Sequence, residues 1–257
     1  MASKGASLIL NYMSDISEEA TTTLAKELEE QHGTRCFSIK ADLGSSEGPS
    51  SLISAAREHF TNEDGDPFRI DILVNNAGVA KNSTIAQTTV EDFEWMYTVN
   101  VRGPLLLVKA VLPYFPRDRS ARIVNVSSIS STEGFVEQSI YGGTKAALEA
   151  MTRTWARELA ECGTVNAVNP GPVKTDMWDR MPIEHRSGLN PWNLHTPLAA
   201  VRVEHDQQEI VSESKVVGGR PGYPSEVAGI VGMLCTEESG WCTGQVVCAN
   251  GGMRMAI

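Results

Sequence analysis

The sequence predicts a single α/β domain built on a parallel sheet, and three observations support that expectation. Short runs rich in β-branched residues alternate with longer segments whose apolar residues recur at helical spacing. Hydrophobic residues form 41% and charged residues 21% of the 257 residues, which suits one substantial core. Neither repeats nor low-complexity tracts divide the chain, so we expect one domain over residues 1–257.

The expected strands are short apolar runs that end in small or polar residues. The first, around Leu8-Ile9-Leu10, is too short for a signal peptide and lacks a cleavage pattern, so a strand is the better interpretation. In chain order, the strands are expected at Ser7–Tyr12, Arg35–Lys40, Ile70–Asn75, Arg122–Ser127, Thr164–Val168 and Gln245–Ala249.

Amphipathic segments between these strands supply the expected helices. In the first helix Ala20, Leu24 and Leu28 recur at steps of four residues, which predicts an apolar face. Residues 178–219, which are interrupted by prolines, are expected to form a substrate lid or a disordered insertion. Helices are expected at about Ser17–Gln31, Ser50–Phe60, Val90–Val99, Gly103–Phe115, Tyr141–Glu161 and Pro224–Cys235.

Charge and composition exclude several classes of protein. The 32 acidic and 22 basic residues give a net charge of −10, which argues against binding to DNA or RNA. No apolar run approaches the length of about 18 residues that a membrane span needs. The 5 cysteines form no C-x-x-C pair, so we expect reduced thiols and a cytoplasmic protein. The 5 histidines have no metal-binding spacing, and we expect no metal site.

Tyr141 and Lys145 open a predicted helix and lie four residues apart, on the same face. A phenol with a pKa near 10 is a poor acid at neutral pH, and a neighbouring ammonium lowers that pKa. The pair therefore suits proton transfer, although the same spacing also describes an ordinary pair on a helix surface.

Ser128 follows a predicted buried strand, at the sheet edge where ligands of open parallel sheets bind. Its hydroxyl is placed to hydrogen-bond a carbonyl or alcohol oxygen. The alternative is that Ser127 and Ser128 cap a turn, and Ser130 and Ser131 compete for the same role.

Small polar sequences follow three further predicted strands. They are Ala41-Asp42-Leu43, Asn75-Asn76-Ala77-Gly78 and Asn169-Pro170-Gly171-Pro172-Val173-Lys174-Thr175. Such residues let a backbone approach a ligand closely, although Asn and Gly also favour plain turns. Because the ends of parallel strands meet at one edge, we expect one shared crevice.

Together these motifs resemble the short-chain dehydrogenase/reductase family over nearly the whole chain. Asn-Asn-Ala-Gly, Asn100, the Ser128–Tyr141–Lys145 set and Asn169-Pro170-Gly171 occur in the family's order, as do the segments Gly219–Glu226 and Gly244–Gly252. The chain looks most like fungal NADPH-dependent ketoreductases of secondary metabolism. The resemblance implies a Rossmann-like, doubly wound parallel sheet and a homo-oligomer, either a dimer or a tetramer.

The resemblance also implies a role for each site residue. Tyr141 would protonate the carbonyl oxygen, Lys145 would lower the pKa of Tyr141 and hold the nicotinamide ribose, and Ser128 would orient the carbonyl. Asn100 would hold a proton-relay water. The implied cofactor-binding residues, beside Tyr141 and Lys145, are Asp42, Asn76, Lys109, Val173 and Thr175. Lys109 is equally well explained as a solvated helix lysine.

The resemblance favours NADP as the cofactor. The first expected strand ends in Leu10-Asn11-Tyr12 and lacks the acidic residue that excludes a 2′-phosphate. One family element is not found: the first strand followed by a Thr-Gly-x-x-x-Gly-x-Gly loop, which binds the pyrophosphate. Residues 1–7 resemble the end of the helix that follows that loop. We therefore expect that a first βα unit of about 30 residues is missing, which a wrongly assigned start codon or intron would explain.

Three functions remain open at this stage. The first is NADPH-dependent reduction of a ketone, or the reverse oxidation, on a small organic or polyketide-type substrate. The second is non-redox enolisation, dehydration or cyclisation by Ser128, Tyr141 and Lys145. The third is a non-catalytic partner of a full-length homologue, paired through the helices at Gly103–Phe115 and Tyr141–Glu161. The intact Ser128–Tyr141–Lys145 set favours the first.

Overall fold

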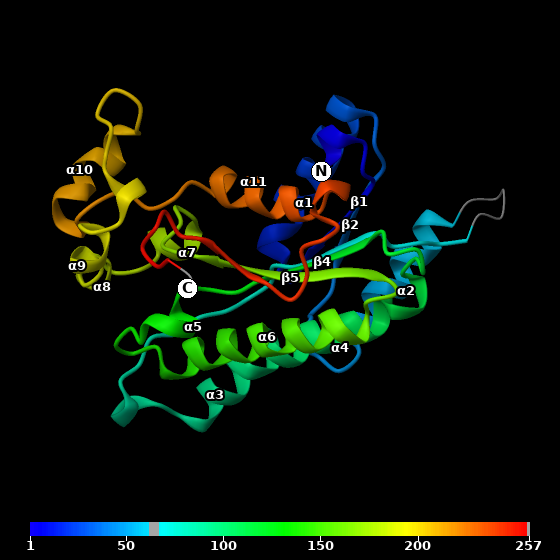
Figure 1. The fold of residues 1–257 in the computed structure, drawn as a ribbon, viewed down its shortest axis with the longest axis horizontal. Helices are drawn as coiled ribbons and strands as arrows, with labels where there is room; N and C mark the ends of the chain where they lie inside the picture. The colour runs from blue at the N-terminus through cyan, green and yellow to red at the C-terminus, as the bar shows by residue number, and fades with distance from the viewer. Residues whose placement is uncertain (62–66, 256–257) are drawn as a thin grey trace.

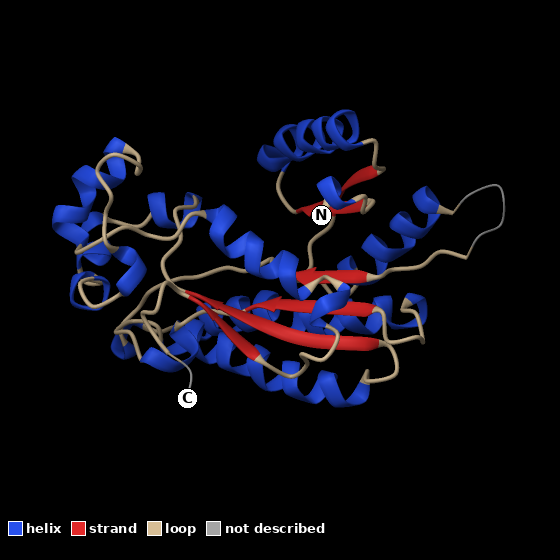
Figure 2. Cartoon of the chain, turned by 45° about the horizontal axis from the view of Figure 1, so that its top comes forward, coloured by secondary structure: helices blue, strands red, loops and turns tan. Residues whose placement is uncertain are grey.

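The strands of this chain are all parallel and fall into two sheets. The computed structural model describes residues 1–61 and 67–255. β1 and β2 pair with each other, whereas β3, β4, β5 and β6 form a larger sheet in that order. Figure 2 shows the short pair set apart from the larger sheet. The bounds are β1 Leu8–Tyr12, β2 Cys36–Lys40, β3 Ile72–Asn75, β4 Ala121–Val126, β5 Gly163–Pro170 and β6 Val246–Ala249.

The centre of the larger sheet is buried on both faces. Along β4 and β5, Ile123 and Val165 contribute to one core cluster, and Val124 and Val168 to another. This alternation follows from the two-residue period of a strand. β1 differs from these central strands because none of its residues is fully buried, and in β3 Asn75 alone is buried.

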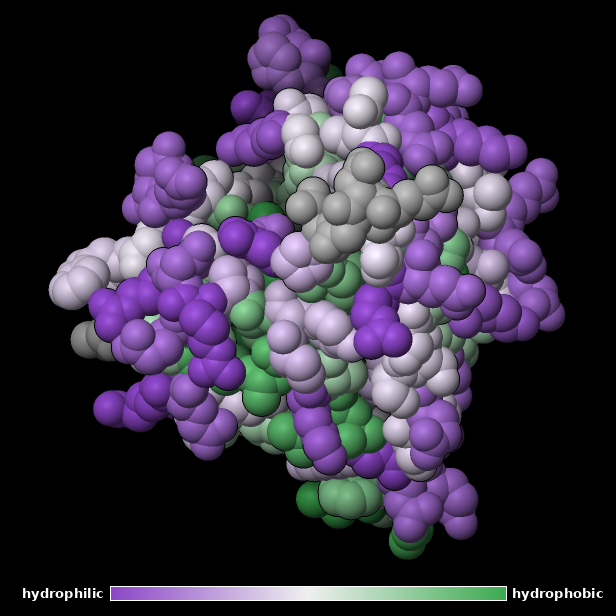
Figure 3. Space-filling model, turned by 90° about the vertical axis from the view of Figure 1, so that its right-hand side faces the viewer, coloured by the Kyte–Doolittle hydropathy of each residue, from purple (hydrophilic) through white to green (hydrophobic). Residues whose placement is uncertain are grey.

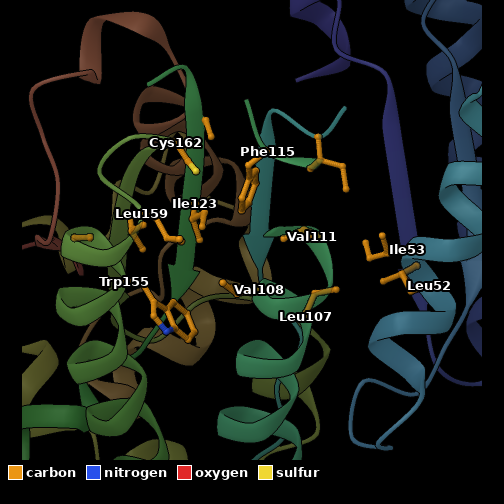
Figure 4. Packing of buried hydrophobic residues seen from close by; sticks show 14 of the residues in the cluster. Leu52, Ile53, Leu107, Val108, Val111, Phe115, Ile123, Trp155, Leu159 and Cys162 are labelled. Atoms are coloured by element: carbon orange, nitrogen blue, oxygen red, sulfur yellow. The ribbon is translucent and has the colours of Figure 1, made fainter. Parts of the chain in front are cut away.

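Helices cover both faces of the sheet, as Figure 1 shows. α2 (Gly48–Phe60), α4 (Gly103–Val111) and α6 (Ser139–Glu158) lie on one face, where their apolar side chains belong to the core cluster that includes Ile123 (Figure 4). α11 (Pro224–Leu234) packs on β4, β5 and β6 from the other face, and α1 (Asp15–His32) packs on β1 and β2. This is the layered arrangement that the sequence predicts.

Shorter helical segments complete the described chain. They are α3 Val90–Tyr97, α5 Ser130–Glu133, α7 Asp176–Asp179, α8 Ile183–Ser187, α9 Asn190–Asn193 and α10 Gln208–Val217. A π-helical turn, η3, spans Thr98–Arg102. Short 3-10 turns lie at η1 Ala2–Lys4, η2 Ile85–Gln87, η4 Leu112–Tyr114, η5 Pro197–Ala199 and η6 Glu237–Ser239.

Each predicted strand is present, with its ends shifted by one or two residues at most. The predicted face of the first helix is wrong: Leu24 is 45% exposed, whereas Ala25 is 6% exposed. On the side of the helix toward β2, the Thr22 hydroxyl lies 3.4 Å from the Ser38 hydroxyl.

The expected irregular insertion at residues 178–219 contains three short helices, α8, α9 and α10, joined by turns and loops. Its packing centres on Trp178, which is 3% exposed. The Trp178 indole donates to Glu213, Arg186 pairs with Glu213, and the Arg186 guanidinium lies 5.6 Å from the Trp178 ring centroid. Trp178 therefore holds short helices together, and it does not line an open surface.

The surface of the described chain is largely polar. On the face that Figure 3 shows, hydrophilic side chains dominate, and apolar residues reach the surface at its centre and lower part. Among the residues that the structure describes, no helix has the length and apolarity to cross a bilayer. The same residues contain no cluster of His, Cys, Asp and Glu side chains suited to a metal ion.

Candidate active site

The four candidate catalytic residues, Asn100, Ser128, Tyr141 and Lys145, are called the candidate tetrad below. They come from three segments: η3, the turn after β4 and the first turns of α6. β3, β4 and β5 run parallel, so the segments that follow them emerge at the same edge of the sheet. The sequence motifs after these strands are thereby brought together.

Asn100 is 1% exposed and joins η3 to the segment that follows β3. Its Oδ1 accepts from Val79 N at 2.8 Å, and its Nδ2 donates to Val79 O at 2.8 Å. Nδ2 also donates to the Thr144 hydroxyl at 3.1 Å, and that hydroxyl donates to Tyr141 O at 2.7 Å. Asn100 therefore fixes the first turn of α6, which carries Tyr141. Thr144 is a site residue that the sequence analysis missed, although it lies inside the Tyr-Gly-Gly-Thr-Lys motif.

Tyr141 lies in the first turn of α6, within hydrogen-bond reach of Ser128. Burial raises the pKa of the Tyr141 phenol above its ordinary value of 10.0, and the hydrogen bond with Ser128 acts in the opposite direction. The lowering of this pKa expected from Lys145 is absent. The physical reason is geometric: the Lys145 ammonium lies 5.7 Å from the ring centroid and donates to a backbone carbonyl elsewhere.

Lys145 is 4% exposed, and burial lowers the pKa of its ammonium from 10.5 to about 8. Its Nζ donates to Val126 O, at the end of β4, at 2.8 Å. Within the described part of the chain this carbonyl is its one hydrogen-bond acceptor, and an ammonium has three N–H donors. Lys145 is thus a buried cation with hydrogen-bonding capacity left over.

Gly78 places the backbone of the segment after β3 close to the Lys145 ammonium. A Cβ built on Gly78 would lie 3.4 Å from Lys145 Nζ and 3.4 Å from Asn100 Oδ1. Any larger side chain would enter the space between these two polar atoms. The glycine of the Asn-Asn-Ala-Gly motif therefore lets the backbone approach Lys145 and Asn100 closely, as the sequence predicts.

Asn75, in the same motif, has a structural role. The Asn75 Nδ2 donates to Asn125 Oδ1 at 2.7 Å inside the sheet.

The segment that follows β2 lies against η3. Asp42 is exposed, and its Oδ1 accepts from Gly44 N at 2.8 Å. Arg102 of η3 donates to Gly44 O, and a Cβ on Gly44 would lie 3.1 Å from Val99. Asp42 is therefore held close to the segment that carries Asn100.

The remaining predicted residues are exposed or lie in loops. Asn76 is exposed after β3, and Thr175 is exposed at the start of α7. Val173 pairs with Gly222 in an isolated parallel bridge, which fixes the loop after β5. Lys109 is exposed on α4, about 9 Å along the helix axis from Gly103. The structure does not bring Lys109 to the candidate tetrad.

A cavity of about 400 Å³ lies between the loop after β5, α11 and the segment after β6. Of the predicted site residues, Val173 alone lines it, together with Asn193, Leu198, Arg220, Val227 and Asn250. The candidate tetrad is not part of its wall. The cavity therefore does not contain the candidate tetrad.

The geometry supports a single chemical task. A buried phenol beside a serine hydroxyl, backed by a buried ammonium and by an amide that orders the helix turn, suits proton exchange with a substrate oxygen. Because burial raises the pKa of Tyr141, its phenol keeps its proton at neutral pH.

Comparisons with known proteins agree with this geometry. A family model described as short chain dehydrogenase matches residues 1–185. The chain is 48% identical to L-xylulose reductase of Aspergillus niger, over 99% of this chain and 91% of that protein. It is 43% identical to L-xylo-3-hexulose reductase of Hypocrea jecorina, over 100% of this chain and 91% of that protein.

Solved structures give the same result. A blue fluorescent protein from a metagenomic library, in complex with NADPH, superposes with a TM-score of 0.80 at 27% identity. The superposition covers 99% of this chain and 90% of that one. In each of these comparisons about a tenth of the other protein has no counterpart here.

Proposed function

This chain belongs to the short-chain dehydrogenase family, and we propose that it reduces the ketone of a small open-chain ketose with NADPH. The observation that carries the proposal is the candidate tetrad at one edge of the sheet, in which Asn100 and Lys145 are buried. The names of the two fungal relatives favour a sugar ketone over the polyketide-type substrate that the sequence analysis expects.

The surroundings of Lys145 fit the ribose-bearing half of a nicotinamide cofactor. Its spare N–H donors suit ribose hydroxyls, and Gly78 leaves the adjoining space free of a side chain. NADPH, when bound, supplies a hydride to the substrate carbonyl carbon. We propose that Asn76, Val173 and Thr175 flank the nicotinamide half and that Asp42 borders the adenine. Lys109, on the outside of α4, has no part in this proposal.

In our proposal the chain's own residues handle the proton. Ser128 donates a hydrogen bond to the ketone oxygen and thereby orients the carbonyl toward Tyr141. Tyr141 gives its phenolic proton to that oxygen as negative charge develops there. Lys145 does not lower the pKa of Tyr141 in this structure, so we assign it no share in stabilising the phenolate. Asn100 holds the water through which Tyr141 regains a proton.

We also propose that a further parallel strand fills the gap between β1 and β3. Leu8 N donates to Arg35 O on β2, so the backbone groups of Ile9 and Asn11 point away from β2. Arg122 N likewise donates to Asp71 O, so the backbone groups of Ile72 and Val74 point away from β4. Each buried unpaired backbone group costs about 1–3 kcal/mol, which favours a strand in this position.

The half-burial of β1 and β3 supports the same proposal, since both would be central strands of a doubly wound sheet. The proposed strand would carry the Gly-rich turn that binds the pyrophosphate, and it would lie outside the 257 residues. Without it, the described residues offer the ribose half of a cofactor site and no phosphate-binding turn between β1 and β3.

The choice of NADP rests on the end of β1. Asn11 donates through Nδ2 to Ile39 O at 3.3 Å and to Ala41 O at 3.0 Å, which ties the end of β1 to the end of β2. No carboxylate follows within β1 to repel a 2′-phosphate. We propose NADPH over NADH on this ground.

Two forms of the protein test the proposal. One is the 257-residue chain, and the other carries a βα unit with a Thr-Gly-x-x-x-Gly-x-Gly turn fused ahead of Met1. We expect the fused form to oxidise NADPH in the presence of L-xylulose and the shorter form to bind NADPH far more weakly. Tight binding of NADPH by the shorter form would reject the additional strand, and absence of ketose reduction in both forms would reject the function.

A second candidate is non-redox enolisation or dehydration by Tyr141, Ser128 and Lys145. It is favoured by one observation: the candidate tetrad is fully assembled although β1 and β3 lie in separate sheets. Turnover of a ketose that survives complete removal of nicotinamide cofactors would support this function and would contradict the first.

Assembly and location complete the proposal. We propose a homo-oligomer, either a dimer or a tetramer, as the family resemblance implies, with α4 and α6 as the candidate interface. Leu105 on α4 is 45% exposed, which suits a contact surface. All 5 cysteines are free in the structure, and on that basis we propose a cytoplasmic protein.

A further inference from the structure

Glu149 is a buried acidic residue on α6 that lies one helical turn after Lys145 and has no part in the proton transfer described so far. It is 7% exposed, and a buried carboxyl group is costly unless donors surround it. Three donors converge on its Oε1: the Ser127 hydroxyl at 2.7 Å, the Ser131 hydroxyl at 2.7 Å and Asn169 Nδ2 at 3.4 Å.

These donors have a common feature: they bracket Ser128. Ser127 precedes it, Ser131 follows it, and Asn169 belongs to the neighbouring strand β5. The turn in between is tight, since Ser131 N donates to Ser128 O at 3.0 Å and Ser130 N donates to Ser128 Oγ at 3.2 Å. Two side chains that anchor both ends of such a turn also determine where its middle residue lies.

We infer that Glu149 is a positioning residue that anchors both ends of the Ser127–Ser131 turn to α6 and so holds the Ser128 hydroxyl beside Tyr141. α6 carries Tyr141 and Lys145 as well, so one helix controls the relative positions of three members of the candidate tetrad. The inference rests on the proposed function for its catalytic consequence, and on geometry alone for the anchoring.

The shared acceptor atom makes the inference testable with a conservative variant. Because both serine hydroxyls meet at Oε1, the amide oxygen of Glu149→Gln, with its two lone pairs, can accept the same two short bonds without a negative charge. Glu149→Met has a similar length and no acceptor, so both serine hydroxyls lose their bond to Glu149, and Ser127 keeps its longer bond to Lys145 O at 3.3 Å. Methionine is expected to fill the space with little change in packing.

Thr152→Val provides a matched control on the same helix. Thr152 is fully buried and accepts from Asn125 Nδ2 at 2.8 Å, so it also ties α6 to β4 through a buried polar contact. Its hydrogen bonds go to Asn125 and to Leu148 O, and neither residue belongs to the Ser127–Ser131 turn. A general loss of polar packing between α6 and β4 would therefore affect this variant in the same way as Glu149→Met.

The first readout is hydrogen–deuterium exchange of the Ser127–Ser131 segment in the 257-residue chain, which needs neither cofactor nor substrate. We expect exchange at least about tenfold faster in Glu149→Met, from an opening about 1.4 kcal/mol easier, and wild-type exchange in Glu149→Gln and Thr152→Val. Unchanged exchange in Glu149→Met, or equal acceleration in Thr152→Val, would overturn the anchoring role.

The second readout is ketose reduction in whichever form shows turnover. Misplacement of Ser128 should lower kcat by about tenfold to a hundredfold in Glu149→Met, with the KM for NADPH little changed, and Glu149→Gln should restore kcat. A Gln variant as impaired as the Met variant would overturn the inference, because the charge and not the acceptor geometry would then matter. If wild type shows no turnover, the proposed function fails, and the exchange experiment still decides the role of Glu149.

Discussion

Replacing Lys145 by Met is expected to stabilise the fold at neutral pH while it removes a residue of the candidate tetrad. The Lys145 side chain is 4% exposed, and burial lowers the pKa of its ammonium from 10.5 to about 8. Since each tenfold change in proton affinity is worth 1.36 kcal/mol, this fall corresponds to a burial cost of about 3 kcal/mol for the charged form.

The pH dependence follows from the direction of the shift. Below pH 8 the ammonium is protonated in both states, so the folded state bears the whole cost. Between pH 8 and pH 10.5 the folded protein releases this proton while the unfolded chain keeps it, so the free energy of unfolding rises with pH. The Lys145 contribution should rise by about 2.5 kcal/mol between about pH 7 and pH 10.

The variant also loses the bond from Lys145 Nζ to Val126 O, which costs about 1 kcal/mol at every pH. We therefore expect Lys145→Met to be more stable than wild type by about 2 kcal/mol at neutral pH. That advantage should disappear at about pH 10, because the burial cost of the wild-type ammonium has then been relieved.

Urea unfolding followed by circular dichroism at neutral pH and near pH 10 measures this difference. Other lysines and tyrosines titrate in the same range in both proteins, so comparison of variant with wild type removes their contribution. Lys26→Met, on the exposed surface of α1, serves as the control and should show no such crossing. A stability difference between Lys145→Met and wild type that stays constant with pH would refute the reasoning.

Three further predictions concern the site. Tyr141→Phe should lower kcat for ketose reduction by about 10²–10⁴-fold with an unchanged melting temperature, and initial rates near the wild-type value would reject Tyr141 as proton donor. Asn100→Ala removes three hydrogen bonds from a side chain that is 1% exposed, so it should destabilise the fold by about 2–3 kcal/mol; a melting temperature equal to that of wild type would contradict this. Gly78→Val places methyl groups beside Lys145 Nζ and should weaken NADPH binding, measured by fluorescence titration, more than stability.

Much of the fold could be predicted from local pattern. The strands were identifiable because each is an apolar run followed directly by polar or small residues, and Ser128 lies just after such a run. Parallel pairing then places the motifs after β3, β4 and β5 at one edge, which needs no tertiary information.

Other features depend on contacts that local pattern does not contain. Leu24 is exposed although it has helical spacing, because the face of α1 toward the sheet is decided by packing on β1 and β2. The short helices at residues 178–219 are held by Trp178, Arg186 and Glu213, which lie far apart in the sequence. Sequence spacing placed Lys145 beside Tyr141, yet its ammonium turns to Val126 O, and burial then dominates the pKa of both groups.

The central claim is that Tyr141 protonates a ketone oxygen while NADPH reduces the carbonyl carbon. Ketose is incubated with NADPH deuterated at C4 of the nicotinamide ring, in the form fused to the Gly-rich βα unit, and the product is examined by mass spectrometry. We predict a polyol with one deuterium on the former carbonyl carbon, and its loss in Tyr141→Phe. A product without deuterium, formed equally well without cofactor, would contradict the claim.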